Sequence, residues 1–416
     1  MPIDRISRSC AAALAALLAG GAAIAQAPAG SAPTLALLGQ KIFFDTSLSR
    51  PAGQACADCH GPAVGFTGPN ERVNRGGGVY PGAVHGRFGN RKPPSAAYAA
   101  APTLATRSEE GETVFFGGSF WDGRATGARL DSALAEQALG PFLNPLEQNM
   151  PDAAAVVAAV CSGPNGGLLR RVAKDERRVA DACAPGQAAA AYDVIGLAIA
   201  AYETSPAAQP FSSRYDRYLA GTEKLTPQEM KGLSLFGGKG KCGECHPHER
   251  RNGQAPLFTD FTYDNIGLPA NPANPFYAMG AEYNPDGKTW KDPGLGGYLK
   301  NEPRWASLAP RNMGKFKVPT LRNVDRRPSP GFVKAYGHNG VFKSLEEVVH
   351  FYNTRDVLPV CGARKGLVAG KGCWPASEEP RNLEHEKTGR LGLTADEETA
   401  IVAFLKTLSD EGAPRR

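Results

Sequence analysis

The chain has 416 residues and a formal net charge of +6, from 47 Lys and Arg against 41 Asp and Glu. The basic residues form no stripe along the sequence, which argues against a nucleic-acid-binding protein. One apolar run near the N-terminus is too short to span a membrane, and no later stretch is longer. The length is sufficient for two domains of ordinary size.

The first 25 residues are typical of a secretory signal peptide. Arg5 and Arg8 charge its start, and an Ala- and Leu-rich run from Ala11 to Ala25 follows. This run ends in the small-residue pattern of a cleavage site. We therefore expect residues 1–25 to be removed and the mature protein to be exported to the periplasm.

Two C-x-x-C-H motifs dominate the mature chain. They are Cys56-Ala57-Asp58-Cys59-His60 and Cys242-Gly243-Glu244-Cys245-His246. In such a motif the two thiols attach a c-type haem, and the adjacent imidazole binds its iron. Zinc is the main alternative, but zinc ribbons place their cysteine pairs about 15–20 residues apart, far closer than here. A thiol redox site is the other alternative, yet it does not need the histidine. We therefore expect two covalently bound haems and a redox protein.

Four further cysteines lie outside the motifs and the predicted signal peptide. They form two local pairs, Cys161 with Cys183 and Cys361 with Cys373, each in a segment rich in Gly and Pro. In an oxidising compartment two disulfides are the expected outcome, each stabilising by about 3 kcal/mol through loop closure. Four unpaired thiols are the alternative.

A short helix is predicted in front of each C-x-x-C-H motif. Residues 38–45 precede the first motif and residues 231–237 precede the second, where Thr226 and Glu229 form a capping box at the helix start. This repeat of helix, short loop and motif resembles the class I cytochrome c domain, in which the helix crosses a C-terminal one.

A candidate closing helix is present in each half of the chain. The first is an apolar segment from Tyr192 to Tyr202, and the second is capped by Thr394 and Glu397. Strand-like alternation is scarce, whereas Gly (49) and Pro (34) are abundant. We expect an all-α fold of two class I cytochrome c-type domains, whose long loops pack on one covalent haem each. The expected organisation is a signal peptide (1–25), an N-terminal domain (26–205), a linker (206–225) and a C-terminal domain (226–416).

Several further motifs resemble those of a known family. They are Phe120-Trp121-Asp122-Gly123-Arg124, Glu136-Gln137-Ala138-Leu139-Gly140-Pro141, Asn144-Pro145-Leu146-Glu147, Lys317-Val318-Pro319-Thr320-Leu321-Arg322-Asn323-Val324, and His338-Asn339-Gly340 with Ser344-Leu345-Glu346-Glu347. This ordered set is similar to that of the bacterial di-haem cytochrome c peroxidase and MauG superfamily, over nearly the whole mature chain. The resemblance implies a peroxidatic haem in the N-terminal domain and an electron-transfer haem in the C-terminal domain.

The resemblance also implies axial ligands for both irons. His60 and His246, inside the motifs, are the proximal ligands. For the first haem, the family's peroxidases have a removable distal His followed by Gly, and His85-Gly86 stands in that place at a longer spacing than usual. A histidine in a surface loop is the alternative. If His85 binds the iron, it has to leave before peroxide can reach it.

Tyr352 is the expected distal ligand of the second haem. Ser344 and Glu347 cap a predicted helix whose apolar face includes Tyr352, while His350 points away from that face. The family's peroxidases have Met here, fourteen residues after the position matched by His338, and the MauG branch resembles this chain in having Tyr. Axial Met raises a haem potential, whereas an anionic Tyr oxygen favours ferric and higher states. A core Tyr packed against the haem edge is the alternative.

Glu147 matches the family's catalytic glutamate, with Gln137 as its companion in the distal pocket. Splitting the O–O bond of peroxide requires a proton to move from one oxygen to the other, a task for a carboxyl group. Burial beside haem would raise the pKa of Glu147, although an isolated glutamate is usually a surface residue. Trp121 matches the tryptophan between the haems and would relay electrons, with core packing as the alternative. Asp122 and Arg124 are predicted to be a structural pair.

One departure from the family concerns calcium, which its members hold between the domains through an Asn side chain and two backbone carbonyls. Lys92 stands at the Asn position, and the Thr-x-Pro loop reads Arg326-Arg327-Pro328. Because an ammonium group can take a cation's place, we hypothesise that calcium is lost.

We expect the protein to be a monomer or a homodimer. Its motifs are compatible with three functions. The first is an oxidoreductase that reduces hydrogen peroxide with electrons from a small cytochrome c or cupredoxin. The second is a MauG-like enzyme that oxidises side chains of a protein substrate, and the third is a non-catalytic electron carrier. The pocket of Glu147 and Gln137 argues against the carrier, and Tyr352 separates the first two.

Overall fold

The computed structural model describes residues 35–362 and 366–411, all within one compact unit. The longer helices are α1 (Leu35–Phe43), α4 (Ala133–Leu143), α5 (Ala153–Ser162), α6 (Gly166–Arg177), α7 (Ala188–Glu203), α9 (Pro227–Gly237), α11 (Leu345–Thr354) and α12 (Ala395–Lys406). The shorter α-helices are α2 (Cys56–Cys59), α3 (Glu71–Arg75), α8 (Arg214–Leu219) and α10 (Gly294–Leu299), and the 3-10 helices are η1 (Pro62–Val64), η2 (Cys242–Glu244), η3 (Pro275–Ala278), η4 (Gly287–Thr289) and η5 (Ala306–Asn312). The strands are β1 (Ala105–Glu109), β2 (Glu112–Phe116), β3 (Tyr263–Asp264) and β4 (Phe316–Lys317). The predicted signal peptide lies outside the described residues and stays a prediction.

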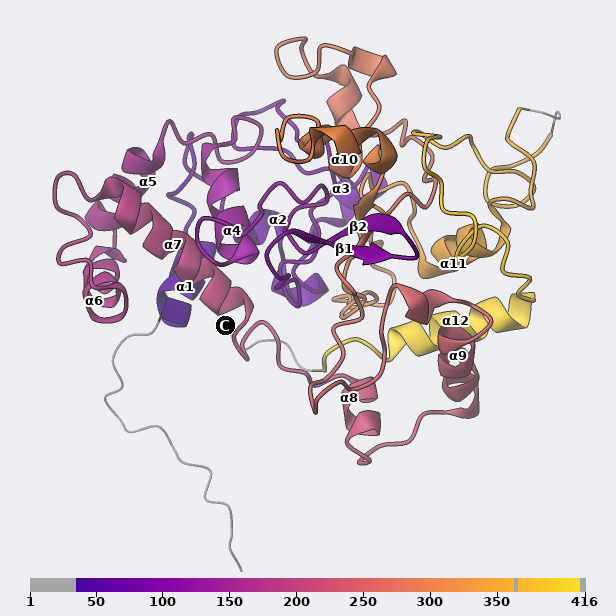
Figure 1. Cartoon of the computed structure of the whole chain (residues 1–416). Helices are drawn as coiled ribbons and strands as arrows, with labels where there is room; N and C mark the ends of the chain where they lie inside the picture. The colour runs from indigo at the N-terminus through magenta and orange to yellow at the C-terminus, as the bar shows by residue number, and fades with distance from the viewer. Residues whose placement is uncertain (1–34, 363–365, 412–416) are drawn as a thin grey trace, which may run out of the picture. The chain divides into compact units, whose positions relative to one another are not determined.

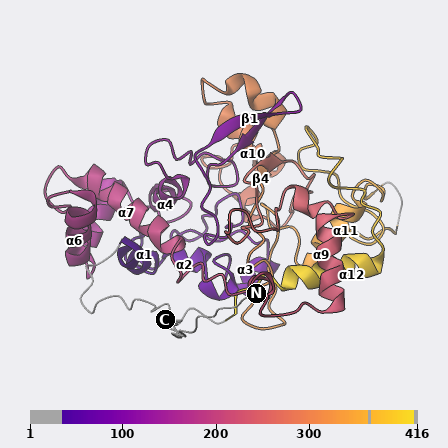
Figure 2. The same cartoon turned by 60° about the horizontal axis from the view of Figure 1, so that its bottom comes forward.

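Two helix pairs cross at close range, one in each half of the chain. Figures 1 and 2 show α1 beside α7, and α9 across α12. A Cβ atom on Gly39 of α1 would lie 1.8 Å from the carbonyl oxygen of Ala198, and one on Gly232 of α9 would lie 2.0 Å from that of Ala400. Glycine therefore lets each pair of backbones touch. The expected crossing of the helix before each motif with a closing helix is present in both halves.

Each crossing is accompanied by an aromatic cluster of the same arrangement. The first cluster is Phe43, Phe66 and Tyr202, and the second is Phe236, Phe258 and Phe404. In both clusters the closest ring centroids lie 5.2 Å apart in an edge-to-face arrangement, a geometry that adds about 0.5–1.5 kcal/mol per pair. The internal repeat thus extends from helix order to ring packing.

The predicted starts of three helices are confirmed by their caps. The side-chain oxygens of Thr226, Ser344 and Thr394 accept hydrogen bonds from the backbone of Glu229, Glu347 and Glu397, whose carboxylates accept from the capping residues in return. Such a cap satisfies backbone donors that the helix leaves unpaired and contributes about 1 kcal/mol.

The prediction of an all-α fold did not include the short strands. β1 and β2 form an antiparallel hairpin with Ala105 opposite Phe116, and β3 pairs with β4 through Tyr263 and Lys317. Most of β1 is exposed on both faces, so its sequence lacks the alternation of a half-buried strand. The remainder is mostly helical with long loops, as expected.

Hydrophobic side chains gather in two main clusters. The buried residues of the first cluster lie between residues 38 and 208, and those of the second lie between residues 215 and 408. The domain boundaries near 205 and 226 stay a prediction. Both predicted disulfides, Cys161–Cys183 and Cys361–Cys373, are present. Across 35–362 and 366–411, no helix has the length and apolar character needed to cross a membrane.

Candidate functional site

The second C-x-x-C-H motif lines a cavity of about 240 Å³. Nδ1 of His246 lies 2.7 Å from the carbonyl oxygen of Phe258. Because a carbonyl only accepts, Nδ1 carries the proton and Nε2 remains available to a metal. Burial lowers the pKa of His246 to about 4, so the imidazole is neutral, as metal binding requires.

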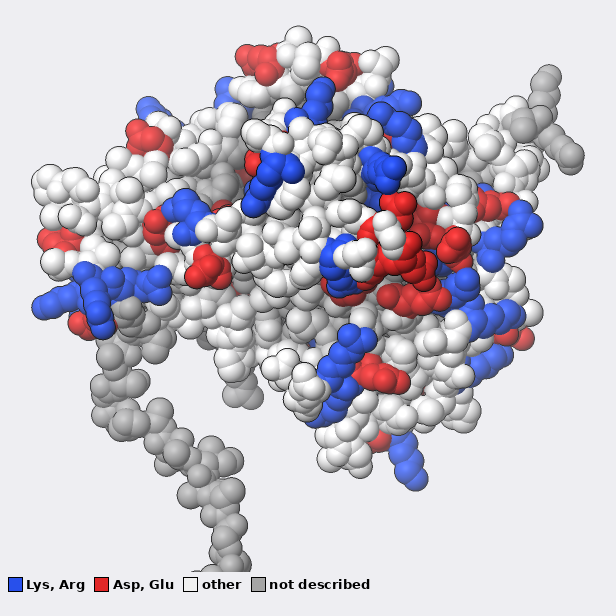
Figure 3. Space-filling model, viewed as in Figure 1, with Lys and Arg blue, Asp and Glu red and all other residues white. Residues whose placement is uncertain are grey.

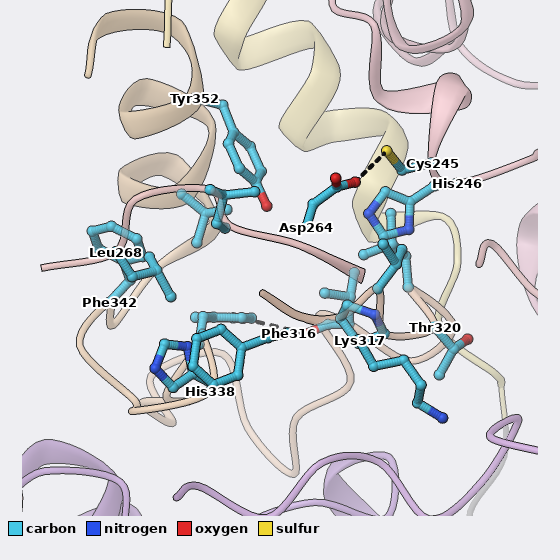
Figure 4. A pocket seen from close by; sticks show the side chains of 18 of the residues that line it. Cys245, His246, Asp264, Leu268, Phe316, Lys317, Thr320, His338, Phe342 and Tyr352 are labelled. Atoms are coloured by element: carbon cyan, nitrogen blue, oxygen red, sulfur yellow. Dashed lines mark hydrogen bonds between the residues drawn. The ribbon is translucent and has the colours of Figure 1, made fainter. Parts of the chain in front are cut away.

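Tyr352 faces His246 across this cavity. Figure 4 shows its hydroxyl group pointing inward from α11, with His246 on the opposite side. Burial raises the pKa of Tyr352, so its phenolate would form only beside a positive charge such as a metal ion. His350, on the same helix, instead lies 3.1 Å from Glu398 and points away, as predicted.

The first motif repeats the arrangement of the second. Cys56 and Cys59 begin and end α2, and Nδ1 of His60 lies 3.1 Å from the carbonyl oxygen of Phe66. Burial lowers the pKa of His60 to about 4 and raises that of Cys56 to about 12. His60 lines a smaller cavity of about 50 Å³ together with Gln137 of α4.

Glu147 lies in the turn that follows α4. Burial raises the pKa of its carboxyl group, opposed by the charge of Arg124 and a hydrogen bond with Asn144. The negative charge of Glu147 in turn raises the pKa of the Cys56 and Cys59 thiols. Glu147 is half-buried and, within the described part of the chain, lines neither cavity. Its burial favours the protonated carboxyl at higher pH than for an exposed glutamate.

Trp121 lines both cavities. Its indole Nε1 donates a hydrogen bond of 2.8 Å to the carbonyl oxygen of Lys92. The next residue, Asp122, forms the expected ion pair with Arg124 at 2.8 Å and a second one with Arg91 at 2.6 Å. These contacts fix the indole at the place where the two cavities approach each other.

His85 is exposed, in a turn of the loop that follows α3. Within the described part of the chain it lines neither cavity. Its loop nevertheless packs on the Glu147 turn, because the backbone N–H of Ala83 donates to the carbonyl oxygen of Glu147 at 2.7 Å.

Two buried lysines bind neutral oxygens. Nζ of Lys92 donates to the Thr67 hydroxyl at 2.7 Å and to the Pro93 carbonyl at 2.8 Å. Nζ of Lys334 donates to three carbonyl oxygens, those of Val64, Asn323 and Arg326, at 2.9, 3.0 and 3.0 Å. Lys92 is the residue predicted to replace a cation, and Lys334, which the sequence did not indicate, lies among three carbonyl oxygens as well.

Over 420 aligned residues the chain is 36% identical to methylamine utilization protein MauG of Paracoccus denitrificans (strain Pd 1222), covering 97% of this chain and 95% of that protein. The chain belongs to the family of MauG and the di-haem cytochrome c peroxidases. The family model described as di-haem cytochrome c peroxidase matches residues 33–224. Cytochrome-c peroxidase IdrP1 of Denitromonas iodatirespirans is 26% identical over 89% of this chain and 80% of its own length. The di-haem peroxidase BthA from Burkholderia thailandensis E264 superposes with a TM-score of 0.72, at 33% identity over 91% of this chain and 86% of BthA.

This di-haem oxidoreductase carries the two covalently bound haems of its family, and its residues fit them. The thiols of Cys56, Cys59, Cys242 and Cys245 lie outside disulfides. Both motif histidines keep Nε2 available. Most of the surface that faces the larger cavity is apolar, and Leu268, Phe316 and Phe342 are among its lining side chains (Figure 4). A hydrophobic shell of this kind controls solvent access and redox potential around a metal.

Phe316, Lys317 and Lys334 were not predicted as residues of the site, yet all three line the larger cavity. Nζ of Lys317 donates to the carbonyl oxygen of Gly118 at 2.8 Å, and burial lowers its pKa to about 7. The one available indication was that Lys317 begins a family motif.

Proposed function

We propose that this protein reduces hydrogen peroxide to water in the periplasm, with electrons from a small cytochrome c or cupredoxin. Each peroxide takes up two electrons and two protons and yields two water molecules. The proposal is carried by the placement of Gln137 with His60 in one cavity and of Glu147 in the turn that follows the helix of Gln137. Burial also raises the pKa of Glu147, and proton transfer during O–O cleavage needs a carboxyl that can both hold and release a proton.

In this proposal the peroxidatic haem belongs to an N-terminal domain (26–205). His60 is its proximal ligand, Glu147 moves a proton from one peroxide oxygen to the other, and Gln137, which lines the cavity of His60, provides a hydrogen bond. The bound haem supplies the iron at which peroxide is reduced. The exposed position of His85 supports a first site that is open without prior displacement of a ligand.

The electron-transfer haem belongs to a C-terminal domain (226–416) in this proposal. His246 and Tyr352 hold it from opposite sides of the larger cavity, a role supported by their placement in Figure 4. Trp121 relays electrons between the two haems, which is supported by its contact with both cavities.

Electron donors would approach a surface with an uneven charge distribution. Figure 3 shows Asp and Glu side chains gathered in one area, where β2 and α11 lie in Figure 1, with Lys and Arg scattered around it. The β1–β2 hairpin carries three exposed glutamates at its turn, Glu109, Glu110 and Glu112. Such an area would steer a donor with a basic face.

Oxidation of a protein substrate is the second candidate function. Tyr352 in the second cavity favours it, because a Tyr oxygen stabilises higher oxidation states than Met does. The 36% identity to MauG also supports this second candidate function.

Calcium is not part of the proposed mechanism. The ammonium group of Lys334 already satisfies three carbonyl oxygens, and a second ammonium, that of Lys92, stands at the family's Asn position. Nζ of each lysine thus occupies oxygen atoms that a further cation would need.

The decisive experiment is spectroscopy of the ferric holoprotein mixed with peroxide. A high-spin haem that reacts without prior reduction, followed by turnover with a reduced small cytochrome, is the expected result. A low-spin protein that reacts only after half-reduction would instead support gating by His85. A holoprotein that never reacts with peroxide would leave the electron carrier.

A further inference from the structure

The imidazole of His338 is buried between the larger cavity and a group of side chains that the proposed function does not use. Its ring stacks on Phe316 with centroids 3.5 Å apart and 10° between the planes, and it meets Trp121 edge-to-face at 6.4 Å. Among the described residues, Nε2 of His338 has no hydrogen-bond partner. The nearest carboxylate oxygen to it is Oε2 of Glu378, at 3.8 Å.

Glu378 links this buried histidine to the surface. Its side chain is 5% exposed, and its second oxygen, Oε1, accepts a hydrogen bond of 2.8 Å from the hydroxyl of Tyr277. Tyr277 is half-buried on η3. A continuous set of contacts therefore runs from Trp121 through His338 and Glu378 to a phenol at the surface.

The segment around Tyr277 is rich in side chains that can lose an electron. The ring of Trp290 lies 6.1 Å from that of Tyr277 and 4.8 Å from that of Phe276, and Met279 and Tyr283 belong to the same segment. Tyr277, Met279, Tyr283 and Trp290 are all half-buried. In Figure 1 this segment precedes α10 near the top of the view.

We propose that Tyr277 is a second oxidation site, at which phenols are oxidised at the protein surface. Tyr277 gives an electron inward along the contacts to Trp121 and its hydroxyl proton to Oε1 of Glu378. A phenol docked beside Tyr277 and Trp290 then gives a hydrogen atom to the tyrosyl oxygen, which restores Tyr277. Glu378 releases this proton to solvent before the next event, and the peroxide takes its two protons from solvent. Two such events supply the two electrons that one peroxide requires, so one peroxide and two phenols yield two waters and two phenoxyl radicals.

The contacts favour this route for physical reasons. Oxidation of a phenol in a poorly solvated place is costly unless its proton leaves at the same time, and the 2.8 Å hydrogen bond to a carboxylate provides the acceptor. The half-buried rings of Trp290 and Tyr277 offer an aromatic phenol a surface to pack on. The inference rests on the proposed reduction of peroxide, which supplies the oxidising equivalents.

The test compares Tyr277→Phe with Tyr283→Phe in the holoprotein. Tyr283 is also half-buried and lies in the same segment, but its ring contacts Arg87 at 5.2 Å rather than a buried acid. Peroxide consumption is measured with 2-methoxyphenol, which gives a hydrogen atom, and with ferrocyanide, which gives only an electron. We expect Tyr277→Phe to lose phenol oxidation by on the order of tenfold or more and to keep ferrocyanide oxidation. Tyr283→Phe should keep both, and ferrocyanide turnover shows that each variant is folded and loaded.

A second readout follows the radical itself. After peroxide addition with a nitroso spin trap, peptide mass spectrometry should find the adduct on Tyr277 in the unmodified holoprotein. In the Glu378→Gln variant the amide still accepts a hydrogen bond from Tyr277 but cannot take its proton. The amount of spin-trap adduct on Tyr277 should therefore fall, while ferrocyanide turnover continues.

The outcomes separate this inference from the proposed function. Peroxide turnover with ferrocyanide but equal phenol rates in Tyr277→Phe and the parent protein would overturn the second site alone. An adduct on Tyr277 without any phenol turnover would also overturn it, since the residue would then only collect oxidising equivalents. A holoprotein that consumes peroxide with neither donor would overturn the proposed function and this inference together.

Discussion

Gly39 lies so close to Ala198 that a Cβ atom added to it would stand 1.8 Å from the Ala198 carbonyl oxygen. The same relationship joins Gly232 to Ala400 at 2.0 Å. Both contacts occur where the helix before a C-x-x-C-H motif crosses a closing helix, so they set the distance between the two helices of each half. A side chain at either glycine has to push two backbones apart.

Gly39→Ala should therefore lower the free energy of unfolding by about 3 kcal/mol, the upper part of the range for an overpacked core. Gly232→Ala should behave alike. Denaturant unfolding of the holoprotein measures both. Gly167→Ala on α6 is the control, because its Cβ would meet no atom closer than 3.8 Å. Equal stability in all three variants would show that the crossings are not tight.

Glu147→Gln should reduce peroxide turnover by about 10²–10⁴-fold, because the amide cannot carry a proton between the peroxide oxygens. Since burial raises the pKa of Glu147, the pH–rate profile of the parent enzyme should show a limb above the usual range of a glutamate, and this limb should disappear in the variant. Steady-state kinetics over pH measure both effects. Glu109→Gln, on the exposed hairpin, is the control, and retention of full turnover by Glu147→Gln would contradict the assignment.

Tyr352→Met should raise the reduction potential of the second haem, because axial Met favours the reduced state more than an anionic Tyr oxygen does. Spectroelectrochemical titration measures the shift. His350→Gln lies on the same helix outside the cavity and should leave the potential unchanged. If Tyr352 only packs against the haem edge, its replacement by Met will not change the ligand-sensitive bands of the spectrum.

Asp216→Asn should lower the free energy of unfolding by about 3–5 kcal/mol near neutral pH, because it leaves a buried charge unpaired. Asp216 accepts two hydrogen bonds of 2.8 Å from Arg322, whose side chain is only 1% exposed. The control is Glu112→Gln, which breaks the exposed pair with Arg311 and should cost about 0–1 kcal/mol.

The effect of Asp216→Asn should depend on pH with a definite sign. Burial raises the pKa of Asp216, but the hydrogen bonds and charge of Arg322 outweigh it and hold the pKa below its usual value. The carboxylate therefore contributes its full stabilisation above about pH 4, where the unfolded Asp is ionised. As pH falls through the native pKa, the difference between parent and variant should shrink. A difference that grows on acidification would have the wrong sign.

Elemental analysis of the purified holoprotein should find no tightly held calcium, and a chelator should leave its unfolding midpoint unchanged. The reason is that Nζ of Lys334 already donates hydrogen bonds to three carbonyl oxygens. One calcium per chain that resists dialysis would refute this expectation.

Much of this protein follows from local sequence. The motifs at Cys56 and Cys242 and the capping boxes at Thr226 and Thr394 are recognisable because haem attachment and helix capping depend on residues only a few positions apart. The disulfide partners were also predictable, since each pair is close in sequence. Short strands such as β1 were not predicted, because backbone pairing with a neighbouring strand stabilises them and their sequences do not alternate between apolar and polar residues.

Other features depend on residues that are distant in the chain. Lys334 meets Val64, Tyr277 meets Glu378, and Trp121 reaches both cavities only because the long loops bring these segments together. The two haem-attachment motifs and the helices beside them could be predicted from residue order alone, since each depends on short-range spacing. Which lysine lies among the three carbonyl oxygens, and where a buried histidine connects to the surface, became visible in the folded chain, because burial and long-range contacts have no local sequence pattern.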